Sequence, residues 1–363
     1  MLSSINTYYA PWPPRVLGKR MRPIRLAVLG LALATTGCLN LPIPRVVTAS
    51  RVEGAPYDSL SKPRDKDQNP FANTRFFIDP DSNAAMQVNR LKGSRSADAK
   101  LLEKIANQPT AAWFGDWTPN IEVTLSRYVA SRMRWNAISV FVLYNLPNRD
   151  CGQYSKGGAV SGDRYRKWID AAKRGIGNAR AVVVLEPDGL PLMDKCLSRE
   201  DQQARVDLVR YAVETLEDSP GIAVYIDAGH DAWLDAKEMA KRLNAAGIDQ
   251  ASGFALNSSN YRATDGLIAY GKAISGMVGG KHFIIDTGRN GHGAPEASGE
   301  AAWCNPDGRA LGIPPTTNTG DPLVDAFYWV KPPGESDGTC NGGPRAGVFW
   351  LDYALGLAKR AAY

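Results

Sequence analysis

The chain has 363 residues, 44% of them hydrophobic, and a formal net charge of +6. This is enough apolar material for one large domain or two small ones. The first 68 residues hold 10 Lys and Arg against 4 Asp and Glu, whereas residues 69–363 hold 33 of each sign. The positive charge therefore belongs to the N-terminal region, and it argues against a nucleic-acid-binding domain.

Residues 21–38 show the pattern of an export signal. Two arginines precede an apolar run over residues 26–34 that is too short to span a bilayer as a helix, and Met21 could then be the true start. The Gly-Cys pair that ends at Cys38 resembles a bacterial lipoprotein box, in which this cysteine would be acylated. Residues 1–38 are assigned to an N-terminal extension with a signal or lipoprotein-type segment. Lipid anchoring, free secretion and an uncleaved anchor stay open as alternatives.

Residues 39–68 are rich in Pro, Ser and charge, which is typical of a linker. From Asn69 onward, short apolar runs alternate with amphipathic stretches. Strands are predicted at residues 111–114, 138–146, 181–185, 223–227, 253–256, 282–286 and 326–330. Helices are predicted at residues 81–91, 97–106, 121–133, 164–175, 199–216, 236–246, 264–278 and 349–361.

This alternation predicts a parallel sheet with helices outside it. About seven such strands within residues 69–363 favour a closed or nearly closed barrel, a TIM-like α/β fold, over an open sheet. The connection over residues 287–322 is rich in Gly, Pro and Asn. We expect it to be a functional loop that lines a cleft.

Carboxylates follow several of the predicted strands. Asp150, Asp188 and Asp227 come after three consecutive strands of the series, and parallel strands that end in this way point their acids into one cleft. Asp188 could be a helix N-cap or a general acid that burial and neighbouring charges keep protonated. The presence of Asp150 and Asp227 favours the general acid.

The last predicted strand runs into a loop that carries Lys331, Glu335 and Asp337. The two acids could be a base and a hydrogen-bonding partner for a sugar hydroxyl, or part of a solvated loop. Lys331 suits substrate binding, because its donors fit hydroxyl groups and its charge can hold nearby acids ionised.

Three tryptophans, Trp113, Trp233 and Trp303, lie at or just after predicted strand ends in polar surroundings. Any one of them could pack in the core. Three in loop contexts nevertheless indicate at least one aromatic platform on which a pyranose ring could stack.

The three histidines show no metal-binding spacing, which makes a catalytic zinc site improbable. His230, close to Asp227, is interpreted as a supporting residue rather than a base. No glycine-rich phosphate loop and no GxSxG motif are present, so nucleotide chemistry and serine hydrolysis have little support. No cofactor and no metal are expected.

Without Cys38, the chain keeps Cys151, Cys196, Cys304 and Cys340, an even set that an exported protein would pair. Three pairings are possible. We favour Cys151 with Cys196, which follow successive acid-bearing segments, and Cys304 with Cys340, which flank the loop after the last strand. Free buried thiols are the alternative.

Five motifs carry a resemblance to a known family. They are YNLPNRDCG at residues 144–152, LEPD at 185–188, YIDAGH at 225–230, WCN at 303–305 and WVKPPGESDG at 329–338. Together they closely resemble glycoside hydrolase family 6, the inverting cellulases, from about Asn69 to the C-terminus. The resemblance implies a distorted barrel of about seven parallel strands, in agreement with the strand count.

The resemblance also implies catalytic roles. Asp188 would be the general acid, Asp150 would raise its pKa and help organise the water, and Tyr144 would distort the central sugar. Asp227 would support the acid and the substrate. Asp337 would be the candidate base, although the proton could instead leave through a water chain towards Asp150.

Further residues match positions that bind substrate in the family. They are Trp113, Trp233, Trp303, Lys331, Glu335, His230, Asn257 and Asn305. The family's disulfides match the favoured pairing. Position 156 departs from the family pattern, because many members carry a Ser where this chain has Lys156. The adjacent Ser155 could take the role of that Ser. Ala236 stands where cellobiohydrolases place a Trp, which favours an open cleft and internal cleavage.

The sequence therefore predicts a hydrolase, an endo-acting β-1,4-glucanase (cellulase) that degrades cellulose or a related polysaccharide with inversion. A cellobiohydrolase, a catalytically weak glucan-binding surface protein and a hydrolase of a related wall polymer are the alternatives. We expect an exported bacterial protein, secreted or lipid-anchored at the cell surface, that acts as a monomer without a nucleic-acid partner.

Overall fold

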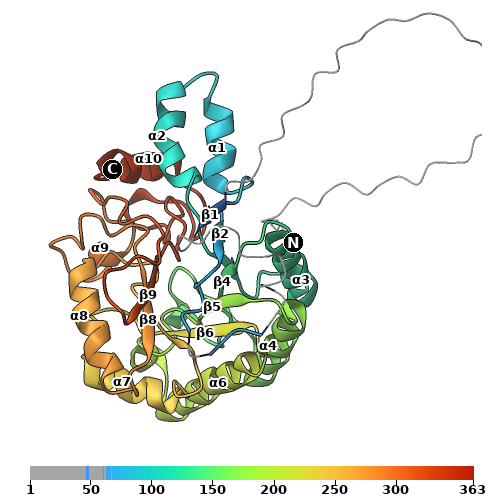
Figure 1. Cartoon of the computed structure of the whole chain (residues 1–363). Helices are drawn as coiled ribbons and strands as arrows, with labels where there is room; N and C mark the ends of the chain where they lie inside the picture. Colours follow the sequence, from blue (N-terminus) through green and yellow to red (C-terminus); the bar gives the residue numbers. More distant parts are fainter. Residues whose placement is uncertain (1–45, 49–59, 61–62, 67) are drawn as a thin grey trace, which may run out of the picture. The chain divides into compact units, whose positions relative to one another are not determined.

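Figure 1 shows the computed structural model of the chain, which describes residues 46–48, 60, 63–66 and 68–363. The expected signal segment with Cys38 lies outside the described residues. Among the described helices, none is both long and apolar enough to cross a membrane.

A seven-stranded parallel sheet organises the fold, and its strands follow one another in space in the order of the sequence. The strands are β3 (Ala112–Phe114), β4 (Ser139–Leu143), β5 (Ala181–Leu185), β6 (Ile222–Asp227), β7 (Gly253–Leu256), β8 (His282–Asp286) and β9 (Val324–Tyr328). The sheet curls into a barrel, and the amide of Ala111 donates to the carbonyl oxygen of Trp329 at 3.1 Å between the two edge strands. This confirms the predicted distorted barrel of about seven strands.

Helices connect successive strands, as the right-handed parallel arrangement requires. The connecting helices are α3 (Ile121–Met133), α4 (Gly162–Ile176), α5 (Met193–Cys196), α6 (Arg199–Glu217), α7 (Ala236–Ala245), α8 (Thr264–Ser275) and α9 (Glu300–Trp303). Before the first strand of the sheet come α1 (Asn83–Leu91) and α2 (Ser96–Ala106), and α10 (Leu351–Arg360) follows the last. Polar caps fix where several begin: Ser161, Ser198 and Asp235 each accept a hydrogen bond from an amide in the first turn. The short helices α5 and α9 were not predicted.

The strands are apolar on both faces because both faces are covered. On β5, Val183 packs outward against the helices, while Val182 and Val184 point into the barrel. Two phenylalanines from the segment before α1, Phe71 and Phe76, fill the barrel interior beside these valines. The barrel interior is thus a packed core, and a functional site can lie only at the ends of the strands.

The packed body begins before the boundary expected at Asn69. A short strand β1 (Val46–Thr48) pairs antiparallel with β2 (Arg75–Phe77). Leu60 is 1% exposed, and Arg64 forms a buried ion pair with Glu217 at 2.5 Å. Part of the segment read as a linker therefore belongs to the domain.

Arg64→Met is expected to destabilise the protein by about 3–5 kcal/mol, because it removes the buried cation that pairs directly with the Glu217 carboxylate. Lys66→Met is the matched control, since Lys66 approaches the same carboxylate at 3.9 Å with its side chain 58% exposed. We expect the control to change the free energy of unfolding by less than about 1 kcal/mol. Urea unfolding measures both, and equal effects would contradict the predicted role of Arg64.

Candidate active site

The acids predicted to converge do so at the carboxyl edge of the barrel. The backbone amide of Asp188 donates to Oδ1 of Asp227 at 3.0 Å, which joins the turns after β5 and β6. Burial raises the pKa of Asp188 well above its usual value, and the charges of Asp227, Asp150 and Asp337 add to this effect. Lys331 opposes the shift. The carboxyl group of Asp188 is thus poised to keep its proton.

The turn that carries Asp188 has an unusual backbone. Both Glu186 and Asp188 have left-handed φ angles, of 53° and 65°, a conformation that costs energy in a residue with a Cβ. The buried carboxylate of Glu186 accepts hydrogen bonds from the amides of Asn145 and Leu146 at 2.9 and 3.0 Å. These bonds tie the turn to the segment after β4. Burial raises the pKa of Glu186 to about 7.

Asp227 is almost fully buried, at 1% exposure. Its Oδ1 accepts from the amides of Asp188 and Gly229 at 3.0 and 3.1 Å, and burial raises its pKa to about 6. The side chain therefore acts on Asp188 both through the backbone and through charge.

Asp150 lies in the segment after β4 and accepts from the amide of Ser155 at 2.7 Å and from the side chain of Gln153 at 3.2 Å. Burial raises its pKa. Burial and the charges of Asp188 and Asp150 raise the pKa of Tyr144 well above its usual value. Tyr144 is therefore a neutral phenol that both acids influence.

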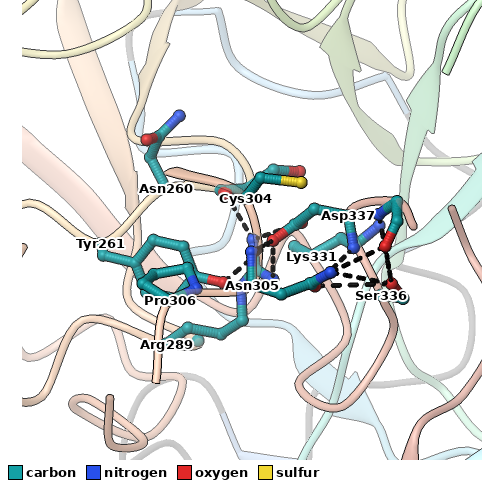
Figure 2. A network of polar contacts seen from close by, with 12 residues as sticks. Asn260, Tyr261, Arg289, Cys304, Asn305, Pro306, Lys331, Ser336 and Asp337 are labelled. Carbon is teal, nitrogen blue, oxygen red and sulfur yellow. Dashed lines mark hydrogen bonds and ion pairs between the residues drawn. The ribbon is translucent and has the colours of Figure 1, made fainter. Parts of the chain in front are cut away.

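Asp337 sits in a dense polar network (Figure 2). Arg289 forms a two-pronged ion pair with it, with Nη2 2.9 Å from Oδ1 and Nη1 2.9 Å from Oδ2. Tyr261 and the amide of Asn305 each donate to Oδ2 at 3.0 Å. Three donors thus occupy Oδ2, whereas Oδ1 is contacted, among the described residues, by the Arg289 guanidinium alone, which leaves a lone pair available.

Two asparagines expected to bind substrate are buried instead. The amide nitrogen of Asn305 donates to the carbonyl of Gly338 at 2.8 Å, and its oxygen accepts from the amide of Asp337 at 2.8 Å. The amide nitrogen of Asn257 donates to the carbonyl of Asp286 at 2.7 Å. Because the amide groups of both side chains already form hydrogen bonds with the backbone, the structure favours a positioning role for them over the expected substrate contact.

His230 accepts a hydrogen bond on Nδ1 from the amide of Ala232 at 3.3 Å. Burial lowers its pKa to about 4, so the ring is neutral at physiological pH. Trp233 lies beside it, with the ring centres 5.5 Å apart. The pair forms a mixed aromatic and polar surface after β6.

The other two predicted stacking residues are also half-buried. Trp113 meets Tyr144 edge-on with the ring centres 5.5 Å apart, and the ammonium of Lys331 lies 5.4 Å from the centre of its ring. Trp303 ends α9, and its ring centre is 6.2 Å from that of Tyr154. The Trp113 ring therefore joins the Lys331 loop to the phenol beside the acids.

Asp286, the last residue of β8, was not predicted as a site residue. Its buried carboxylate accepts from the amides of Ser259, Gly288, Val330 and Lys331 at 2.9–3.2 Å. It thus joins the loops after three strands and fixes the backbone of Lys331. The signal was available, since Asp286 ends an apolar strand in the same way as Asp227.

Glu335, on the same loop as Lys331, has a half-buried side chain whose pKa burial raises. Its Oε1 lies 3.4 Å from the side-chain amide of Asn83.

The two favoured disulfides are present, between Cys151 and Cys196 and between Cys304 and Cys340, which confirms the pairing. In the described part of the chain, no group of three or more His, Cys, Asp or Glu is placed to hold a metal ion.

The structure is thus an α/β barrel that carries a cluster of interacting carboxylates, flanked by aromatic rings, at the carboxyl ends of its strands. The family model described as "Glycosyl hydrolases family 6" matches residues 71–361. The chain belongs to this family.

Relatives and solved structures agree with this assignment. Endoglucanase A of Thermobispora bispora is 44% identical over 79% of this chain, and endoglucanase A of Cellulomonas fimi is 42% identical over 81%. The chain spans 62% and 63% of these two proteins, about three fifths of their length. The structure of the endoglucanase Cel6 of Mycobacterium tuberculosis, bound to a thio-linked cellobioside, is 46% identical with a TM-score of 0.77, covering 80% of this chain and 99% of that one.

Proposed function

We propose that the chain is an endo-acting β-1,4-glucanase that cleaves internal bonds with inversion. The observation that carries the proposal is Asp188, a buried carboxyl group at a strand end with three further carboxylates close enough to raise its pKa. Two acids with opposite protonation on either side of a glycosidic bond are what this hydrolysis needs.

Asp188 is assigned as the general acid that protonates the leaving oxygen. Asp227 holds it through its backbone amide, and Asp150 adds negative charge. Tyr144 contacts the central sugar as a neutral phenol.

Asp337 is assigned as the candidate base. An inverting enzyme places acid and base about 6.5–9.5 Å apart, with a water between them. The free lone pair on Oδ1 of Asp337 could accept the proton of that water. The three donors on Oδ2 make this oxygen unsuitable as the proton acceptor. Proton removal through a water chain towards Asp150 remains the alternative.

Substrate binding is assigned to Trp113, Trp233 and Trp303 through stacking, and to Lys331 and Glu335 through hydrogen bonds to hydroxyl groups. His230 would accept from a donor or support Trp233. This division follows from exposure, because these side chains are only half-buried while Asn257 and Asn305 are closed off.

Endo cleavage is favoured over the cellobiohydrolase alternative by similarity. The endoglucanases matched here are 39–44% identical to the chain, whereas the probable cellobiohydrolase C of Aspergillus terreus is 33% identical. Ala236 begins α7 with no aromatic ring to guide a chain end. This suits an open cleft.

Export is part of the proposal. Two disulfides within one chain fit an oxidising compartment. Secretion or acylation at Cys38 and action as a monomer are proposed on the sequence pattern alone.

Hydrolysis of carboxymethylcellulose tests the proposal. We expect a rapid fall in viscosity with few new reducing ends, and an α-anomer as the first product seen by NMR. Slow loss of viscosity with release of cellobiose would identify a cellobiohydrolase. Binding of cello-oligosaccharides without any turnover would identify a glucan-binding protein and refute the proposed hydrolase activity.

A further inference from the structure

Trp117 is an aromatic residue at the rim of the site, and it was not among the predicted site residues. It follows β3 by three residues, at the same edge of the barrel as the acids, and it is 46% exposed. Single exposed tryptophans are common on protein surfaces, so exposure alone decides nothing. The informative feature is how firmly the ring is held.

Arg149 covers one face of the Trp117 ring. Its guanidinium carbon lies 4.8 Å from the centre of that ring and 4.8 Å from the centre of the Tyr144 ring. Arg149 is itself fixed, because it forms an ion pair with Asp116 at 2.6 Å and donates to the carbonyl oxygen of Tyr144 at 2.9 Å. A cation between two aromatic faces is a favourable arrangement, and here it anchors Trp117 to the residue beside the acids.

Gly115 supports the edge of the ring. A Cβ at this position would lie 2.5 Å from Cζ3 of Trp117 and 2.6 Å from the carbonyl oxygen of Tyr144, so only glycine permits the contact. The turn is closed by the amide of Thr118, which donates to the carbonyl oxygen of Gly115 at 2.9 Å. With one face on Arg149 and one edge on Gly115, the exposed part of the ring is a fixed aromatic surface that faces solvent.

We propose that Trp117 is a further glucan-binding residue, on whose free face a glucosyl unit of a long chain stacks. The inference rests on the proposed function and names a binding position beyond Trp113. Trp113 lies within the same strand and its ring contacts that of Tyr144, so β3 and the turn after it supply two aromatic rings at this edge of the barrel. A pyranose presents a face of C–H groups, which suits a preorganised ring of this kind.

The ligand class follows from the position. Trp117 is 46% exposed, whereas Trp113 is half-buried against Tyr144, so a β-1,4-linked glucan chain that fills the central position and Trp113 would reach Trp117 only with units farther out. Short oligosaccharides end before it. The contribution of Trp117 therefore grows with chain length, whereas that of Tyr144 does not.

The test is hydrolysis of cellotetraose and cellohexaose by the full chain with Trp117→Ala. We expect kcat/KM on cellohexaose to fall about five- to tenfold, mainly through KM, as the loss of one aromatic contact implies. Cellotetraose should be nearly unaffected. Trp135→Ala is the matched control, because Trp135 is 39% exposed just before β4, at the opposite edge of the barrel; it should change neither substrate.

An equal loss on both substrates would overturn the inference, since it would show that Trp117 acts by supporting Arg149 and the catalytic centre. An unchanged rate on cellohexaose would overturn it as well. Trp117→Phe, which keeps a ring over Arg149, should recover part of the loss. Calorimetry of cellohexaose binding makes the same comparison without turnover when Trp117 and Trp117→Ala are compared in proteins that also carry Asp188→Asn. If the wild type cleaves nothing, the proposed function is refuted, and the binding data still decide the role of Trp117.

Discussion

Asp188→Asn is expected to lower kcat on cellohexaose by about 10³-fold, because a general acid contributes about 10²–10⁴-fold to such a step. Asparagine keeps the shape of the side chain and leaves the amide that donates to Asp227 in place. It cannot donate a proton to the leaving oxygen. Initial rates of reducing-sugar release measure the effect, and the affinity for cellohexaose should change little.

A substrate with a good leaving group is the control for this prediction. Dinitrophenolate leaves without protonation, so the variant should retain much more of its activity on a dinitrophenyl cellobioside. An equal loss on both substrates would indicate damage to the site, and near-normal activity on cellohexaose would refute the role of Asp188.

The pH profile of the wild type is a second readout of the same role. Burial and the charges of Asp227, Asp150 and Asp337 raise the pKa of Asp188. A general acid must be protonated to act, so kcat should persist above the range in which ordinary carboxyl groups ionise and fall as pH rises through the raised pKa. That alkaline limb should be absent in Asp188→Asn.

The fold was predictable because the strands are buried on both faces. Residues 181–185, 253–256 and 282–286 were predicted with the bounds that the structure shows. The last strand was placed at 326–330, whereas β9 is Val324–Tyr328. Trp329 and Val330 are still 0% exposed after the strand pairing ends, and an apolar pattern reports burial rather than hydrogen bonding.

The site was predictable to the extent that strand ends define it. Asp150, Asp188 and Asp227 could be placed at one edge because each follows an apolar run. Arg289 could not, because it lies in a long irregular connection and its role depends on a carboxylate 48 positions away. For the same reason, sequence could not distinguish a buried Asn305 from one that faces substrate.

Arg289→Met is expected to lower the free energy of unfolding by about 3–5 kcal/mol, because it leaves the buried carboxylate of Asp337 without its counter-charge. The side chains of Arg289 and Asp337 are 1% and 6% exposed. Arg289 also donates to the carbonyl oxygen of Ser259 and lies over the ring of Tyr261 at 4.4 Å. Chemical denaturation followed by tryptophan fluorescence measures the loss.

Arg174→Met is the control, since Arg174 and Glu122 form an ion pair of the same length, 2.9 Å, with side chains 58% and 44% exposed. It should cost less than about 1 kcal/mol. Adding Asp337→Leu to Arg289→Met removes the stranded charge, so the double variant should be more stable than Arg289→Met alone. If the second substitution lowers stability further, the cost of losing Arg289 comes from Ser259 and Tyr261 rather than from the ion pair. Turnover should be lost in both variants, because Arg289→Met removes the ion pair that orients the Asp337 carboxylate and the double variant removes that carboxylate itself.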